Sequence, residues 1–228
     1  MILLEAVRGR SLEPYDARTG HSDSEVGVDH PHGGRMPGRF WWVWLTLVTL
    51  IAVEFSLNTW GATLLNEQGG LSTAAAAAAV GCLTGGVLIG RIIGARLSES
   101  VSTEILLPVS IATCLVGFLA MWLSSSGVVM LIGFFVAGLG MSLHWPMGIT
   151  RTLRASQGRP DRAGALVGIG VGITASVGPI LLGLAAGAWG VHQAFWLVPI
   201  VLVFALVLAV VVRVPDPLAA IEAESHAR

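Results

Sequence analysis

The chain has 228 residues, of which 54% are hydrophobic and only 12% are charged, with a formal net charge of -1. A soluble domain carries about 25% charged residues, so this composition excludes an ordinary soluble protein, and the lack of a basic surplus excludes a nucleic-acid partner. The apolar residues fall into blocks of about twenty, the length that crosses a hydrocarbon core of about 30 Å as a helix.

The order of these blocks predicts one membrane domain between two polar tails. Residues 1–38 are polar and predict a cytoplasmic tail, without the basic lead and apolar run of a secretory signal. Its histidines lack the spacing of a metal site. Residues 39–213 predict six transmembrane helices, at about 41–63, 74–97, 105–123, 128–149, 163–188 and 194–212. Residues 214–228 predict a second cytoplasmic tail. Kinks are expected where Pro146, Pro179 and Pro199 interrupt spans.

The arginines predict the orientation of the six spans. All thirteen basic residues are arginine, and with six spans every one of them lies on the same side of the membrane. The positive-inside rule makes that side cytoplasmic, so both termini are expected there. Trp41, Trp42 and Trp44 mark the inner interface in this topology, and Trp60, Trp122 and Trp189 mark the outer one. Arginine without lysine, together with abundant Ala, Gly and Val, indicates a GC-rich bacterial genome and hence a bacterial inner membrane.

Glycine is unevenly shared among the spans. Helices in lipid associate through close contact between small residues, so glycines at four-residue spacing predict packing faces. The second and fifth spans carry such stripes, with Gly81, Gly85, Gly164, Gly168 and Gly172 as the expected contact residues. The sixth span has no glycine and the third has one. The third and sixth spans, Ala205 included, are therefore expected to face lipid.

Two spans carry polar residues that suggest function. Glu54 is the one acidic residue well inside an apolar block, roughly 20 Å along the helix from Trp41. A carboxylate at that depth usually faces a cavity or a bundle interior, and Asn58 shares its face. Glu54 is read either as a proton-coupling or substrate group, or as a protonated structural group. His144 of the fourth span is read either as a proton carrier or as a packing residue.

Residues past the end of the fourth span suggest lipid contacts. Arg151 and Arg154 follow its apolar block directly. They are read as interfacial anchors to lipid phosphates rather than as substrate ligands.

Three segments resemble major facilitator superfamily transporters. Residues 90–98 (GRIIGARLS) resemble the second-half copy of that family's Gly-Arg loop motif, and residues 138–146 (GLGMSLHWP) resemble its tenth helix. The glycines and Pro179 of 178–187, followed by Ala194 and Phe195, resemble its eleventh and twelfth helices. The resemblance covers about residues 40–213 and implies a half bundle equivalent to helices seven to twelve, with 1–38 as the central loop. The other six-helix half of that family is not present in this sequence.

The resemblance also implies roles for residues. The first and fourth spans would line a central cavity, so Glu54, Asn58, His144 and Trp145 would form the substrate or proton-coupling site. Gly90, Arg91, Gly94 and Arg96 would form the gating loop. The second and fifth spans would meet the missing half or a second copy of this chain, and the third and sixth would face lipid.

These features predict a half-length secondary transporter of a small solute, proton-coupled and without a cofactor, since no Gly-rich phosphate loop supports direct ATP drive. The alternative is a non-transporting membrane subunit that associates with another membrane protein through its glycine faces. An enzyme is not expected. Ser142 and His144 are two residues apart on one helix and would point in different directions, which argues against an intramembrane protease.

Overall fold

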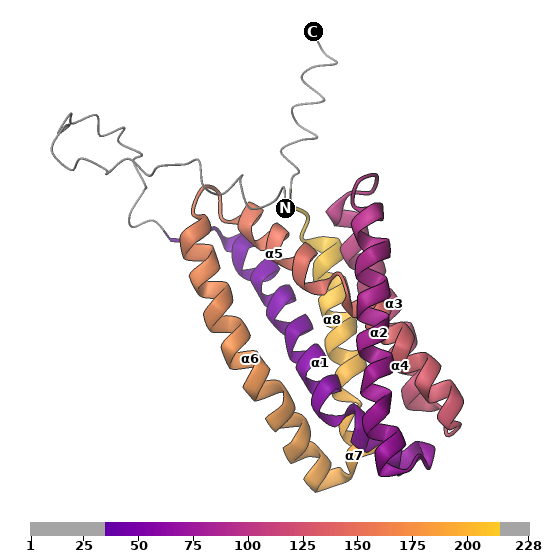
Figure 1. Cartoon of the computed structure of the whole chain (residues 1–228). Helices are drawn as coiled ribbons and strands as arrows, with labels where there is room; N and C mark the ends of the chain where they lie inside the picture. The colour runs from indigo at the N-terminus through magenta and orange to yellow at the C-terminus, as the bar shows by residue number, and fades with distance from the viewer. Residues whose placement is uncertain (1–34, 215–228) are drawn as a thin grey trace, which may run out of the picture. The chain divides into compact units, whose positions relative to one another are not determined.

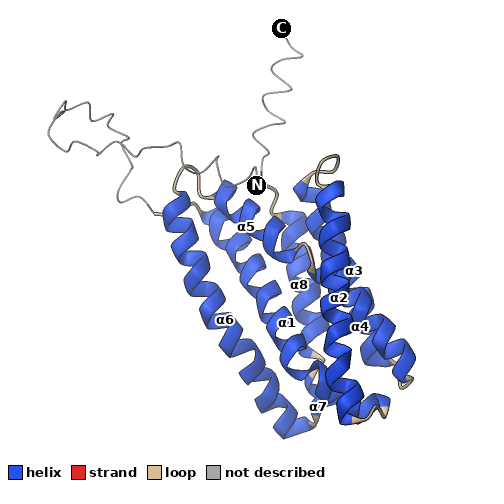
Figure 2. Cartoon of the chain, in the orientation of Figure 1, coloured by secondary structure: helices blue, strands red, loops and turns tan. Residues whose placement is uncertain are grey.

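Helices make up almost all of the described chain (Figure 1). The computed structural model describes residues 35–214, so the two predicted tails lie almost wholly outside the described residues. The helices are α1 (Gly38–Gly69), α2 (Thr73–Leu97), α3 (Thr103–Leu123), α4 (Gly127–Met141), α5 (His144–Ala155), α6 (Pro160–Trp189), α7 (Val191–Ala194) and α8 (Leu197–Val211). Figure 2 shows helices and loops throughout this part of the chain. They form 6 spans long and apolar enough to cross a membrane, which confirms the predicted all-α, six-helix fold.

Two of the six spans are each built from two helices. The fourth span breaks between α4 and α5, just before Pro146. Proline has no N–H to donate to the carbonyl four residues earlier, here that of Ser142, so the helical ladder cannot run on without a gap. The sixth span breaks between α7 and α8, and Pro199 lies in the first turn of α8, where a missing N–H costs little. Pro179 lies inside an unbroken α6.

Helix α1 occupies the middle of the arrangement, because it contacts α2, α5, α6 and α8. In Figure 1, α6 and α2 lie on opposite sides of α1. In the most apolar stretch of each helix, 56% of α1 is buried, against 28% of α2 and 17% of α6. Helices α2 and α6 therefore leave most of their apolar surface uncovered by the rest of the described chain.

Glycine allows α3 and α4 to pack backbone against backbone. A Cβ added at Gly117 of α3 would meet the backbone of α4, and one added at Gly133 or Gly140 of α4 would meet the backbone of α3. Contact of this kind is how membrane helices gain dispersion energy without a hydrophobic driving force. The third span was expected to face lipid, and that expectation is wrong for the face of α3 that packs against α4. Another face of α3 exposes Val109 and Val116.

Helix α8 requires a similar correction. Ala205 was expected to face lipid, but its side chain is fully buried within the bundle. The exposed side of α8 instead carries larger residues, including Val203 and Val207. A glycine-poor span thus still has a buried face, built here from alanine and leucine.

Two tryptophans join α1 to α6. The indole Nε1 of Trp44 donates to the carbonyl of Leu166 at 2.9 Å, and that of Trp60 donates to the carbonyl of Pro179 at 3.0 Å. These side chains were expected to mark the two membrane interfaces. In the structure each also forms a contact between spans and helps to hold α1 against α6.

A polar cluster lies at the end of the bundle where α1 begins and α2 ends, which we call the arginine end. Arg151 was expected to anchor to lipid phosphate, but its side chain is only 1% exposed and pairs with Glu104 of α3. It also donates to the carbonyls of Ala209 and Val212 at the end of α8. The lipid-anchor expectation for Arg151 is therefore wrong, because the guanidinium is buried among three spans.

A second polar cluster lies at the opposite end of the bundle. The side-chain amide of Gln68 donates to the carbonyls of Trp122 and Ser124, and its oxygen lies 2.7 Å from Nδ1 of His192. The indole of Trp122 donates to the His192 carbonyl at 2.9 Å, and the two rings stack with centroids 5.2 Å apart. This cluster joins α1, α3 and α7.

Candidate functional site

Glu54 and Asn58 lie one turn apart on α1, as their spacing predicts. Glu54 is half-buried and Asn58 is exposed. The amide of Asn58 donates to the backbone carbonyl of Glu54 at 2.8 Å, so this side chain is held along its own helix. The Glu54 carboxyl group lies close enough to the Arg91 guanidinium of α2 to interact with it electrostatically. An acidic and a basic side chain on neighbouring spans therefore face the same region.

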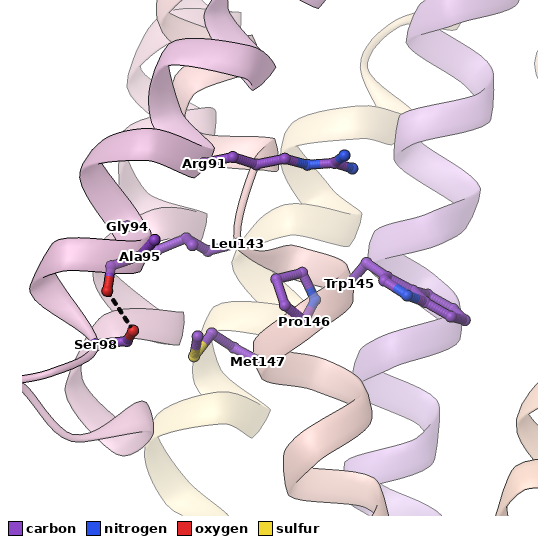
Figure 3. Close-up of a pocket in the computed structure, with 8 residues that line it drawn as sticks. All are labelled: Arg91, Gly94, Ala95, Ser98, Leu143, Trp145, Pro146 and Met147. Carbon is purple, nitrogen blue, oxygen red and sulfur yellow. Dashed lines mark hydrogen bonds between the residues drawn. The ribbon is translucent and has the colours of Figure 1, made fainter. Parts of the chain in front are cut away.

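Arg91 lines a groove between α2 and α5. Arg91 lies roughly six residues before the end of α2 at Leu97, which is about 9 Å along the helix axis. Figure 3 shows Arg91 and Trp145 reaching to the same side of the groove from different helices. The groove has a volume of about 430 Å³ and is lined by Arg91, Gly94, Ala95, Ser98, Leu143, Trp145, Pro146 and Met147. Its walls are mostly apolar, and Arg91 is the one charged residue among them.

His144 and Trp145 begin α5 but point in different directions. Trp145 lines the groove and is 39% exposed. His144 is fully buried, so the expectation that it lines the same cavity is wrong. The backbone of Ser110 on α3 lies near the imidazole, yet neither ring nitrogen has a well-formed hydrogen bond to the described residues. Successive residues of a helix are about 100° apart, which explains why only one of the two can face the groove.

The residues expected to form a gating loop are all helical. Gly90, Arg91, Gly94 and Arg96 lie in the last two turns of α2. Gly90 packs against Ser142 and Leu139, and Gly94 packs against the side chain of Leu143, so both hold α2 against the broken fourth span. These residues lie within the predicted span 74–97, and their part in gating stays a prediction. The two glycines set the distance between the two walls of the groove.

The five glycines predicted as packing residues lie on open faces. A Cβ added at Gly81, Gly85, Gly164, Gly168 or Gly172 would meet nothing within 4 Å among the described residues. Other glycines on the same helices do pack inside the bundle: Gly86 and Gly90 of α2 against α4, and Gly170 and Gly183 of α6 against α1. Each of these helices thus has one glycine face that is occupied and one that is not.

Comparison with known proteins identifies the family. A family model described as Major Facilitator Superfamily matches residues 43–227. The chain belongs to the Major Facilitator Superfamily. No curated protein matches it. Membership of the superfamily confirms the resemblance found in the sequence.

A solved member of the superfamily has a similar fold. It is a peptide transporter POT variant in complex with alafosfalin, with 18% sequence identity and a TM-score of 0.67. The likeness covers 86% of this chain but 45% of that one, so the present chain spans under half the length of the transporter it resembles. At this identity the likeness supports the fold alone.

Arg91 was assigned from the sequence to a loop, and its position in the groove was missed. The signal that singled out Glu54 also applies to Arg91, because an arginine several residues inside a span is costly unless it faces water or a partner. The same reasoning applies to Arg151, but its charge is compensated by the ion pair with Glu104. Sequence alone does not distinguish the two arginines, because the difference lies in which neighbouring helix supplies a carboxylate.

Proposed function

We propose that the chain is one six-helix half of a secondary transporter that moves a small solute across a bacterial inner membrane, driven by a proton gradient. The observation that carries this proposal is the electrostatic interaction of Glu54 on α1 with Arg91 on α2, beside a groove that also holds Trp145. Ionisable residues inside a span typically mark a substrate or ion pathway. The superfamily and its fold are the framework in which such a pathway operates.

Glu54 is the proposed proton carrier. Its carboxyl group interacts electrostatically with the groove cation Arg91, and it is half-buried within a span. Protonation removes its charge and so changes the field that Arg91 experiences. Asn58 lies one turn away on the exposed side of α1 and is proposed to contact the solute. We assign His144 to packing, because its side chain is buried away from the groove.

A second six-helix bundle is proposed to complete the pathway. The open glycine faces of α2 and α6 support this, because they flank α1 and are uncovered in the described part of the chain. The partner is either an N-terminal half or a second copy of this chain. In both cases both termini of this chain would lie on the cytoplasmic side.

The test is uptake into proteoliposomes with an acidic exterior, using a panel of radiolabelled small solutes. We expect at least one solute to accumulate and the accumulation to collapse with a protonophore. Glu54→Gln keeps the shape of the side chain but cannot change charge, so it should abolish gradient-driven accumulation and leave solute exchange intact. Glu67→Gln, an exposed position at the far end of the same helix, is the matched control. Normal accumulation in Glu54→Gln would remove Glu54 from the coupling mechanism.

The second candidate function is a membrane subunit that binds another membrane protein without transporting a solute. The same open glycine faces favour it. It predicts that the purified chain forms a defined complex while no solute accumulates in proteoliposomes. Accumulation of any solute under a proton gradient rejects it.

A further inference from the structure

We propose that the groove between α2 and α5 binds a small organic anion, with Arg91 taking its carboxylate and Trp145 contacting its apolar body. This inference deepens the proposed function and rests on it for the view that the anion is the transported solute. It assigns Arg91 a role in binding rather than in a loop, and it names the chemical class of the ligand.

Arg91 has hydrogen-bond donors available for an anion. Among the described residues no carboxylate forms an ion pair with it, whereas Arg151 is fully paired with Glu104. A guanidinium inside a span is expensive unless water or an anion meets it. Because it is planar and carries several N–H donors, it is suited to bind both oxygens of a carboxylate. Arg91 is exposed towards the groove and has this capacity available.

The volume and lining of the groove also fit a small organic anion. Its volume of about 430 Å³ lies in the range of small-ligand sites. Leu143, Pro146 and Met147 make one wall apolar, and the half-exposed Trp145 adds an aromatic surface. The hydroxyl of Ser98 is already used, donating to the carbonyl of Ala95 at 2.8 Å (Figure 3). One cation in an apolar site favours a ligand with one negative group and an apolar body.

Protonation of Glu54 should affect how strongly Arg91 binds an anion. When ionised, Glu54 partly neutralises Arg91 from across the α1–α2 contact. Protonation of Glu54 leaves the charge of Arg91 to the ligand, so proton and anion should strengthen each other's binding, as linkage requires. Another titratable side chain that interacts with Glu54 is the buried Cys114 of α3, while α5 carries the buried His144 and α2 carries Cys82. In the sequence, α6 after Arg162 and the whole of α8 contain none. One proton and one carboxylate would then move as a neutral pair.

An anionic lipid headgroup has the same chemistry as a small organic anion. We commit to the small anion, because the groove is lined by side chains of two helices and has the volume of a small-ligand site. The two sources are separated by the composition of the membrane in which binding is measured.

The experiment uses radiolabelled benzoate and the full chain in phosphatidylcholine nanodiscs. Benzamide and benzamidine have nearly the shape of benzoate but are neutral and cationic. We expect benzoate alone to compete well, and Arg91→Gln to weaken benzoate binding by about 10- to 100-fold, the usual value of a charged hydrogen-bonded pair. Arg39→Gln, an exposed arginine at the start of α1, is the matched control and should bind as the parent does. Trp145→Ala should weaken benzoate more than acetate, which has no ring.

A second measurement needs no change in the groove. Glu54→Gln mimics the protonated carboxyl group, so it should bind benzoate at all pH values as tightly as the parent does in acid. A parent protein whose benzoate binding is independent of pH would remove the linkage. If benzamide competes as well as benzoate, or if Arg91→Gln binds normally, the anion site itself is rejected. The benzamide comparison decides the matter even if Arg91→Gln does not fold.

Two further outcomes separate this inference from its alternatives. Addition of phosphatidylglycerol to the nanodiscs should leave benzoate binding unchanged, and its loss would identify a lipid headgroup as the ligand and overturn the proposal. Arg91-dependent benzoate binding without gradient-driven uptake supports the site and rejects the transporter function. Gradient-driven uptake with benzoate binding that ignores Arg91 does the reverse.

Discussion

Arg151 and Glu104 form a bidentate ion pair that joins α5 to α3. Nε of Arg151 lies 2.8 Å from one carboxylate oxygen and Nη2 lies 3.0 Å from the other. The same Nη2 donates to the carbonyls of Ala209 and Val212, which end α8 without other partners from their own helix. One guanidinium therefore holds three spans together at the arginine end.

Removing this guanidinium should destabilise the bundle strongly. Arg151→Met leaves the Glu104 carboxylate and two carbonyls buried without a donor, and loss of one partner of a buried pair costs about 3–5 kcal/mol. Arg151→Met combined with Glu104→Gln should recover part of the loss, because the stranded charge is gone. Thermal unfolding in detergent measures both. A single variant that unfolds at the temperature of the parent would show that the pair contributes nothing.

The α3–α4 contact predicts a different kind of sensitivity. Gly133→Ala would place a methyl group against the backbone of α3 at Met121 and Gly117, and neither helix can yield without separating. Overpacking of this kind costs about 1–3 kcal/mol. The thermal midpoint of the single bundle should fall accordingly. Gly81→Ala, which meets nothing within 4 Å, is the matched control and should unfold as the parent does.

The open glycine faces predict defects in assembly rather than in folding. Gly168→Leu lies on the uncovered side of α6, so the bundle should fold normally but lose its complex with a second half or second copy. Val207→Leu on the exposed side of α8 is the control. Crosslinking in membranes, followed by size analysis, measures the complex. Equal loss in both variants would mean that glycine has no special part in the association.

The predicted orientation can be tested by cysteine labelling. Ser125 lies in the connection between α3 and α4, and Gln157 lies in the turn between α5 and α6; both are exposed and at opposite ends of the bundle. In a background without Cys82 and Cys114, a membrane-impermeant maleimide added outside cells should label Ser125→Cys but not Gln157→Cys. Labelling of Gln157→Cys alone would invert the topology.

The six spans were predictable from the sequence because span length and hydropathy are local properties. The packing partners were not. Gly117 is the one glycine of its span and gave no visible stripe, yet with Gly133 and Gly140 on the next helix it makes a contact of backbone against backbone. His144 and Trp145 were expected in one cavity, and only the break before α5 determines which of them reaches it. Arg151 and Arg91 carry the same chemical signal, and only the placement of Glu104 tells them apart.

The Gln68 cluster has a consequence for the proton on His192. Because the Gln68 nitrogen donates to two carbonyls, its amide orientation is fixed and its oxygen can only accept. Nδ1 of His192 must then carry the hydrogen, which leaves Nε2 as the acceptor of the neutral ring. Deamidation of Gln68 to glutamate would replace two donated hydrogen bonds by repulsion between oxygens. The amide of Gln68, which deamidation can remove, thus sets the tautomer of His192 on another span.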